Sequence, residues 1–269
     1  MPIQAPRFLP LAPRLVVLHC SASGPAQWDA YRALVDPDVC WMAAALQGYD
    51  SNTRWPVGAR TTLAAEARRV FAALANSSGE VHLVGHSYGG AVALQVAVMW
   101  PERIRSVTVH EPVLAHLLQR DAASAPQAAE LLQVAAAVSA GVQAGDDEAA
   151  AERFVDYWSG PGTWARVGTG RRAALARHMP KVVAEFGALV TATADYAEME
   201  PVGPEVRIVA GSASPAPVRR AAELLHRQVP HATFTEVAGA GHMAPVLDPA
   251  RLAPLLFPEH AREPLALAA

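Results

Sequence analysis

Short apolar runs recur along the chain, and longer segments with helical spacing separate them. The apolar runs occupy residues 14–19, 39–43, 80–85, 104–110, 206–210 and 232–237. The clearest helical segments occupy residues 61–76, 88–100 and 215–228. Strands that alternate with helices form βαβ units, whose strands lie parallel in one sheet. The run from Leu15 to Leu18 has no polar residue at alternate positions, as expected of a strand covered on both faces. The pattern predicts an α/β fold, a doubly wound and mostly parallel sheet with helices on both faces.

One long segment interrupts this alternation. Residues 113–204 contain no convincing strand, and their best helical stretches are residues 128–142, 146–158 and 171–194. The breaker sequence Gly-Pro-Gly at 160–162 separates two of these stretches. We therefore divide the chain into a core, residues 1–112 and 205–269, and a helical cap, residues 113–204.

The composition excludes several classes of protein. A hydrophobic content of 52% with 17% charged residues is that of a globular protein rather than a disordered one. The net charge of -3 argues against a general nucleic-acid or membrane surface, so we expect neither partner. Two cysteines cannot form a disulfide framework in 269 residues. With no secretory signal and no long apolar stretch in the sequence, we expect a cytoplasmic protein; a homodimer is left open.

A serine stands between glycines where a predicted strand meets a predicted helix. Residues 85–90 have the sequence Gly-His-Ser-Tyr-Gly-Gly, which places Ser87 in a G-x-S-x-G pattern. In this context the pattern is typical of a nucleophile elbow, because small neighbours let the chain double back sharply at the serine. The start of the following helix adds a positive dipole end near developing negative charge. An ordinary glycine-rich turn is the alternative, but the order of strand, turn and helix favours a nucleophile.

A serine needs a base to become a nucleophile, and one histidine is well placed for this role. His242 lies in the sequence Gly-Ala-Gly-His-Met at 239–243, on a loop after the last predicted strand. The order of serine first and histidine last fits the elbow fold. His86, next to the serine, is interpreted as shaping the elbow rather than as a second base.

These residues resemble those of α/β-hydrolases, and the resemblance covers nearly the whole chain. Residues 18–23 stand where that family has its His-Gly-x loop, residues 47–51 resemble its G-x-G-x-S loop, and residues 241–245 resemble its catalytic histidine loop. The resemblance implies that the backbone N–H groups of Ser21 and Tyr88 form an oxyanion hole. It also implies that the cap lies between the sixth and seventh family strands. Cys20 replaces the usual glycine of the first loop.

The resemblance raises two further expectations. Family members usually begin with an antiparallel pair of strands, but residues 1–13 are rich in proline and too few for that hairpin. We therefore expect a sheet of about six strands. The family's acid usually follows the strand after the cap, at or near Ser214, yet no carboxylate lies between Glu205 and Glu223.

A second position for the acid exists at the end of the strand before the cap. Glu111 follows this strand, and some α/β-hydrolases, notably a subset of haloalkane dehalogenases, carry their acid there. The carboxyl ends of parallel strands are where ligand sites form. We interpret Glu111 as the acid that orients His242; the alternative is a hinge residue bonded to backbone N–H groups.

A serine nucleophile, a histidine base and two N–H donors suit acyl transfer to water. We therefore expect a serine hydrolase that cleaves a carboxylic ester, lactone or thioester of a small apolar molecule. We expect no cofactor and no metal, since the sequence has no matching motif. We place His19, Trp158, Trp164 and Met243 in the substrate pocket. A C–C bond hydrolase, perhydrolase or lyase on the same scaffold remains open, as does a binding protein without catalysis.

Overall fold

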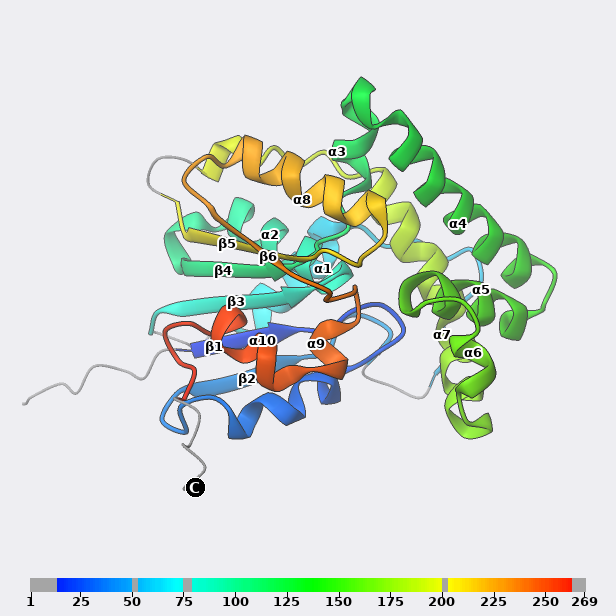
Figure 1. Ribbon diagram of the computed structural model, residues 1–269, viewed down its shortest axis with the longest axis horizontal. Coiled ribbons are helices and arrows are strands. Elements are labelled where there is room, and N and C mark those ends of the chain that lie inside the picture. Colours follow the sequence, from blue (N-terminus) through cyan, green and yellow to red (C-terminus); the bar gives the residue numbers. More distant parts are fainter. Residues whose placement is uncertain (1–13, 50–52, 75–78, 200–202, 263–269) are drawn as a thin grey trace, which may run out of the picture.

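The computed structural model describes residues 14–49, 53–74, 79–199 and 203–262. Its centre is a six-stranded sheet in the order β2-β1-β3-β4-β5-β6, in which every neighbouring pair is parallel (Figure 1). The strands are β1 (Arg14–Leu18), β2 (Cys40–Ala44), β3 (Val81–His86), β4 (Ile104–His110), β5 (Glu205–Gly211) and β6 (Thr233–Val237). The predicted α/β-hydrolase sheet is confirmed. The expectation about the N-terminal hairpin concerns residues 1–13, which lie outside the described residues.

Two hydrophobic cores cover the two faces of the sheet. In β1, Val16 and Leu18 belong to the core on one face, whereas Leu15 and Val17 belong to the core on the other. This division follows from the alternation of side chains along a strand. The first face is packed by α1 (Leu63–Ala73), α2 (Tyr88–Met99) and α8 (Ala216–Gln228). The second is packed by the 3-10 helix η1 (Pro25–Ala33) and by α10 (Pro249–Leu256), which follows the short helix α9 (Ala244–Leu247).

The segment between β4 and β5 is helical. It contains α3 (Ala115–Arg120), α4 (Ala125–Gln143), α5 (Asp147–Ser159), α6 (Thr163–Arg166) and α7 (Thr169–Val190). We call residues 113–204 the cap segment; its helices α4 to α7 lie beyond the carboxyl ends of the strands (Figure 1). Helix α5 begins where the Asp146 side chain accepts a hydrogen bond from the N–H of Ala149, a typical N-cap. Helix α7 ends at Val190, four residues before the predicted end at Ala194.

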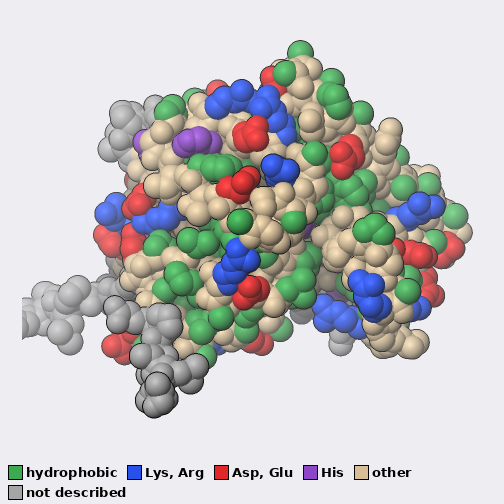
Figure 2. Space-filling model, in the orientation of Figure 1, with side chains coloured by type: hydrophobic (Ala, Val, Ile, Leu, Met, Phe, Trp, Pro, Cys, Tyr) green, Lys and Arg blue, Asp and Glu red, His purple; other side chains and the backbone are tan. Residues whose placement is uncertain are grey.

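None of the helices in the described part of the chain has the length and apolar character to cross a bilayer. Acidic and basic side chains are interspersed over the face shown in Figure 2.

Candidate active site

Ser87 occupies a strained turn between β3 and α2. Its φ of 57° and ψ of −119° are unusual for a residue with a side chain. Glycines permit the turn: a Cβ at Gly85 would lie 2.5 Å from the carbonyl oxygen of Gly89, and one at Gly89 would lie 2.4 Å from that of His19. The N–H of Ser87 donates to the carbonyl of His110 at 3.0 Å, which ties the turn to the end of β4. The sequence therefore forms an elbow that presents the serine hydroxyl.

Three side chains form a continuous chain of hydrogen bonds at this elbow. His242 Nε2 lies 3.0 Å from Ser87 Oγ, and His242 Nδ1 lies 2.7 Å from Glu111 Oε2. With Nδ1–H donating to the carboxylate, Nε2 is free to accept the serine proton. All three residues are buried, with exposed fractions of 5% for Ser87, 3% for His242 and 0% for Glu111. This arrangement has the geometry of a nucleophile, a base and an orienting acid.

Glu111 is held in place by the backbone around it. Its φ is 44°, its N–H donates to the carbonyl of Val209 at 3.0 Å, and its Oε1 accepts from the N–H of Gly211 at 2.6 Å. Burial by itself would raise the pKa of this carboxyl group, but the hydrogen bond from His242 and the nearby imidazoles hold the pKa below its usual range. Glu111 is therefore a carboxylate at neutral pH.

Ser214, the position at which the family usually has its acid, lies close to Glu111. Ser214 is buried, and its hydroxyl is among the groups that lower the pKa of Glu111. This proximity follows from the topology, because β4 and β5 are adjacent and His110 pairs with Val209. Side chains at the carboxyl ends of these two strands thus lie close together.

The loop that carries His242 has further support. His86 Nε2 donates to the carbonyl oxygen of His242 at 2.8 Å, and the Gln27 amide donates to His86 Nδ1 at 3.2 Å. Burial lowers the pKa of His86 well below its ordinary value, so this ring is neutral. The indole of Trp158 lies against the His242 ring, with centroids 4.3 Å apart and planes 33° apart. His86 therefore holds the loop that carries the base.

The loop after β1 places Ser21 beside the elbow. The N–H of Cys20 donates to Gln27 Oε1 and the N–H of Ala22 donates to the hydroxyl of Tyr49, each at 2.9 Å, so the loop is fixed on both sides of Ser21. Ala22 has a φ of 55° and, with Ser87 and Glu111, makes up the non-glycine residues with positive φ in the described part of the chain. Tyr49 belongs to the loop that resembles the G-x-G-x-S motif, of which Asp50 and Ser51 lie outside the described residues.

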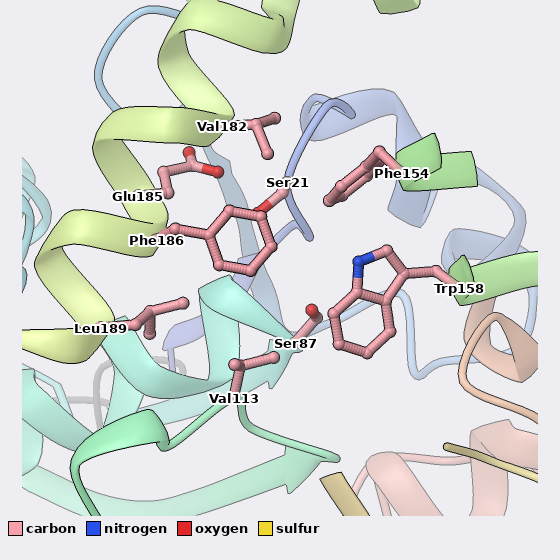
Figure 3. Close-up of a pocket in the computed structure, with 9 residues that line it drawn as sticks. All are labelled: Ser21, Ser87, Val113, Phe154, Trp158, Val182, Glu185, Phe186 and Leu189. Carbon is pink, nitrogen blue, oxygen red and sulfur yellow. The ribbon is translucent and has the colours of Figure 1, made fainter. Parts of the chain in front are cut away.

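Two spaces meet at Ser87. The smaller one is shown in Figure 3 and is lined by Ser21, Ser87, Val113, Phe154, Trp158, Val182, Glu185, Phe186 and Leu189. The larger one is a cavity of about 380 Å³ whose lining includes Ser21, Ser87, Phe154, Trp158, Arg166, Arg171, Leu175, His242 and Met243. The helices of the cap segment thus provide much of both walls.

Two of the four predicted pocket residues do not line these spaces. His19 is buried, with Nδ1 donating to the carbonyl of Cys20 at 2.8 Å and Nε2 accepting from the N–H of Leu46 at 3.2 Å, so it fixes the loop. Trp164 is buried within the cap segment, where the Arg172 guanidinium lies 5.3 Å from the ring centroid. Placing these two residues in the pocket was wrong; Trp158 and Met243 do line the larger cavity.

Sequence reasoning did not single out Glu185, which lines the smaller pocket from α7. A glutamate four residues after Lys181 in a helix has the spacing of a surface ion pair. Both residues are in fact buried, at 0% exposed for Lys181 and 1% for Glu185. Apolar neighbours on both sides of Glu185 in the sequence were the only local signal.

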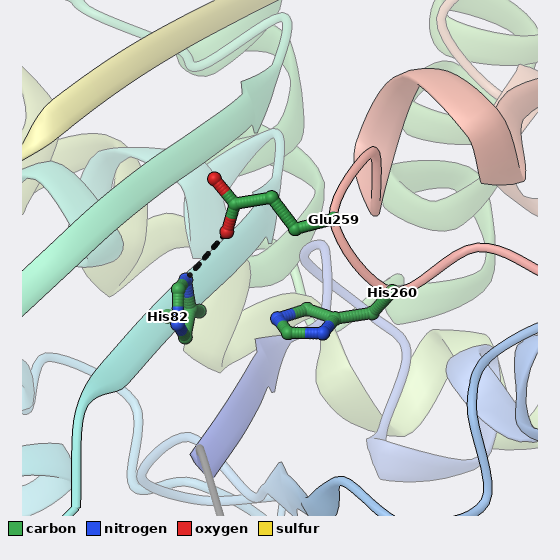
Figure 4. Close-up of side chains that lie close together, drawn as sticks. All are labelled: His82, Glu259 and His260. Atoms are coloured by element: carbon green, nitrogen blue, oxygen red, sulfur yellow. Dashed lines mark ion pairs between the residues drawn. The ribbon is translucent and has the colours of Figure 1, made fainter.

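One group of side chains in the described part of the chain has the composition of a metal site. It consists of His82, Glu259 and His260 (Figure 4). His82 lies near the start of β3, at the opposite end of this strand from Ser87. Its Nδ1 lies 2.8 Å from the Ser106 hydroxyl, and Glu259 forms an ion pair of 2.7 Å with Arg207. Protein groups therefore already contact two of the three ligand candidates, and the cluster is remote from the elbow.

The chain is similar in fold to several solved structures. No curated protein sequence matched the chain. Among solved structures, a hydrolase from Pseudomonas aeruginosa PA01 is 21% identical with a TM-score of 0.71, covering 92% of this chain and 89% of that one. A thermophilic esterase from Thermogutta terrifontis is 19% identical with a TM-score of 0.66, over 90% and 86% of the two chains. MenH from S. aureus is 14% identical with a TM-score of 0.65, over 92% of each chain.

At these identities the structural likenesses show the fold. The model of the alpha/beta hydrolase family matches residues 15–255, which is most of the sequence. The chain therefore belongs to the alpha/beta hydrolase family.

Proposed function

We propose that the protein is a serine hydrolase that cleaves an ester-type bond in a small apolar molecule through an acyl-enzyme. A carboxylic ester, a lactone or a thioester meets this description. The observation that carries the proposal is the chain of hydrogen bonds from Ser87 through His242 to Glu111, formed at a strained elbow between two cavities. The esterase among the similar structures supports it at the level of the fold.

Each residue of the chain has a role in acylation. His242 Nε2 accepts the hydroxyl proton as Ser87 Oγ attacks the carbonyl carbon, and Glu111 stabilises the imidazolium that forms. The negative charge on the carbonyl oxygen is met by the N–H groups of Ser21 and Tyr88. Collapse of this intermediate breaks the ester bond, and His242 gives its proton to the departing alcohol. The products are the alcohol and an ester between the acyl group and Ser87.

Deacylation repeats these steps with water. His242 takes a proton from the water as its oxygen attacks the acyl carbon, and the proton is then returned to Ser87. The free acid leaves and the serine hydroxyl is restored. Each cycle therefore consumes one ester and one water and yields one acid and one alcohol.

We infer from the position of His242 which cavity takes which half of the substrate. The departing alcohol must lie within reach of His242 to receive its proton. Of the two spaces at Ser87, His242 lines the larger one. The alcohol half therefore occupies the larger cavity, and the acyl half occupies the smaller pocket.

Glu111 weakens the alternative of a binding protein without catalysis. That alternative depended on the missing carboxylate near Ser214, and the carboxylate of Glu111 contacts His242 instead. C–C bond cleavage, perhydrolysis and lyase chemistry would use the same Ser87 and His242, and no observation in the described residues favours one of them over ester hydrolysis.

Labelling with a fluorophosphonate tests the proposal directly. We expect the reagent to modify Ser87, identified by peptide mass, and Ser87→Ala to lose this labelling and to lower kcat for 4-nitrophenyl acetate by about 10⁴ or more. Ser139→Ala is the matched control, because Ser139 lies on α4 away from the elbow and should leave both readouts unchanged. Unchanged turnover in Ser87→Ala would refute the serine mechanism. A folded wild-type protein that is neither labelled nor active would favour the binding protein.

A further inference from the structure

A buried carboxyl group that lacks a well-aligned hydrogen bond faces the smaller pocket. Glu185 lies on α7 and lines this pocket together with Ser21 and Ser87. Its side chain is 1% exposed, and neither of its carboxyl oxygens has a well-aligned hydrogen bond within the described part of the chain, although the hydroxyls of Ser21 and Tyr49 lie near enough to lower its pKa. Figure 3 shows the carboxyl group turned toward Ser21. A buried acceptor without a well-aligned hydrogen bond is costly, so its presence beside the nucleophile calls for a ligand.

The nearby lysine does not account for this carboxyl group. Lys181 Nζ lies 2.6 Å from Glu66 Oε1 but 3.7 Å from Glu185 Oε1. The same ammonium group lies 4.8 Å from the ring centroid of Trp55 and 5.5 Å from that of Tyr88. One cation therefore serves two buried carboxyl groups, and Glu66 has the closer contact. This longer contact leaves Glu185 with capacity to accept a hydrogen bond from a substrate.

The surroundings of Glu185 keep it able to accept a hydrogen bond near neutral pH. Burial raises its pKa to about 7, although the charge of Lys181 acts in the opposite direction. Tyr49 and Tyr88 face the same group, and burial raises their own pKa values, so both phenols are neutral. Whether protonated or ionised, the carboxyl group presents an oxygen that can accept a hydrogen bond.

The rest of the pocket defines the molecule that fits there. Val113, Val182, Phe186 and Leu189 give it hydrocarbon walls. An acyl chain in this pocket would thus contact carbon on most sides and one carboxyl group. An ammonium group on that chain would be repelled by Lys181, which lies beside the same carboxyl group. A hydroxyl group carries no charge and donates one hydrogen bond.

We propose that the acyl half of the substrate is a short chain bearing a hydroxyl group, which donates a hydrogen bond to Glu185. This inference rests on the proposed function, because it assumes that an ester binds with its acyl half in the smaller pocket. Glu185 then determines specificity: it selects hydroxyacyl esters over plain acyl esters of the same length. Sites that bond a substrate hydroxyl discriminate strongly against analogues without it, because the buried partner is left unpaired.

Matched phenyl esters test the proposal. We would measure kcat/KM for the butyrate, 2-hydroxybutyrate and 3-hydroxybutyrate esters, which share one chain length and one leaving group. In the wild-type protein at least one hydroxy ester should exceed butyrate by about tenfold or more, the factor that a hydrogen bond to a charged group contributes. Glu185→Leu should lower this ratio by a similar factor, and Glu185→Gln, which keeps an acceptor oxygen, should retain part of it. The control Glu152→Leu changes an exposed glutamate on α5 and should leave the ratio unchanged.

The outcomes separate this inference from the proposed function. If butyrate is hydrolysed but neither hydroxy ester is preferred, the inference is wrong and the proposed function stands. If Glu185→Leu keeps the full preference, Glu185 is not its source and the inference is also wrong. If the wild-type protein hydrolyses none of the esters and Ser87 takes no fluorophosphonate, the proposed function itself fails. Should Glu185→Leu not fold, the wild-type series and Glu185→Gln still decide the matter.

Discussion

Glu111 makes two hydrogen bonds with different purposes, so two substitutions at this position should have different effects. One bond receives the Nδ1–H of His242 at 2.7 Å, and the other receives the N–H of Gly211 at 2.6 Å. Glu111→Gln keeps the shape and an oxygen for Gly211, but it places an amide where His242 needs a carboxylate. Glu111→Ala removes both acceptors and leaves the N–H of Gly211 without its acceptor. Comparing the two variants therefore separates catalysis from folding.

The magnitudes follow from these contacts. Loss of the carboxylate should lower kcat by about 10⁴ in both variants, which corresponds to about 5.5 kcal/mol of activation free energy. Glu111→Gln should unfold at nearly the wild-type urea concentration. Glu111→Ala should lose about 1–3 kcal/mol of unfolding free energy, the typical cost of a buried donor left without a partner. The assays are the turnover of 4-nitrophenyl acetate and urea unfolding followed by circular dichroism.

A third variant checks whether Ser214 and Glu111 reach the same imidazole. Adding Ser214→Asp to Glu111→Ala should restore turnover by about tenfold or more, since an acid partner is worth several orders of magnitude in kcat. Ser214→Asn in the same background is the matched control and should restore nothing. Turnover within tenfold of wild type in Glu111→Gln would refute the reasoning, because the orienting acid would then lie elsewhere.

The remaining predictions concern stability. Gly85→Ala should lower the unfolding free energy by about 1–3 kcal/mol, because the new Cβ would lie 2.5 Å from a carbonyl oxygen. Gly187→Ala should raise the unfolding free energy by about 0.5–1 kcal/mol, because Gly187 lies within α7 with open space around it. Urea unfolding measures both changes, and a Gly85→Ala protein as stable as wild type would contradict the packing argument. Burial lowers the pKa of His19 and His110 to about 4 in the folded protein, so between pH 6.5 and pH 4 the unfolded chain binds more protons than the folded one. Lowering the pH through this window should therefore reduce the unfolding free energy by up to about 3 kcal/mol for each histidine. Glu185 has a raised pKa, so its protonation should stabilise the folded protein as the pH falls from 7 to 5. Over that interval Glu185→Gln should therefore lose unfolding free energy more steeply than the wild-type protein. An unfolding free energy that rises over the same interval in this variant would show that the raised pKa was assigned to the wrong group.

Local sequence patterns were sufficient for the framework and for the elbow. The apolar runs became strands because a buried parallel strand needs unbroken hydrophobic residues, and Gly85 and Gly89 indicated the turn because close backbone contacts leave no room for a side chain there. The sequence also singled out Glu111 and His242, and the structure brings them into contact. Glu111 can stand in for an acid near Ser214 because β4 and β5, the strands that end close to these two residues, are neighbours in the sheet.

For the cap segment, the sequence predicted helices but not which of their side chains would line the pocket. Trp158 and Trp164 lie six residues apart in similar helical sequence, yet one lines both cavities and the other is buried within the cap segment. Contacts between distant segments determine which face of a cap helix meets the core. The local spacing of hydrophobic residues does not predict these contacts. Glu185 illustrates this limit, because its burial depends on α7 packing against the loops after β1 and β2.

The contact between Trp158 and His242 links the chemistry to the position of the cap segment. Trp158 presents its ring to the imidazole at a centroid separation of 4.3 Å, and an aromatic face attracts a cation more strongly than a neutral ring. In the proposed mechanism, the imidazolium that forms in each half of the reaction would therefore be held more tightly by α5 than the resting imidazole. Coupling of this kind is reciprocal: if α5 stabilises the proton on His242, that proton stabilises α5 over the site to the same extent. By the proposed mechanism, the cap segment would be bound to the core most tightly while His242 carries the proton, and this interaction would weaken when the proton leaves with the alcohol or returns to Ser87.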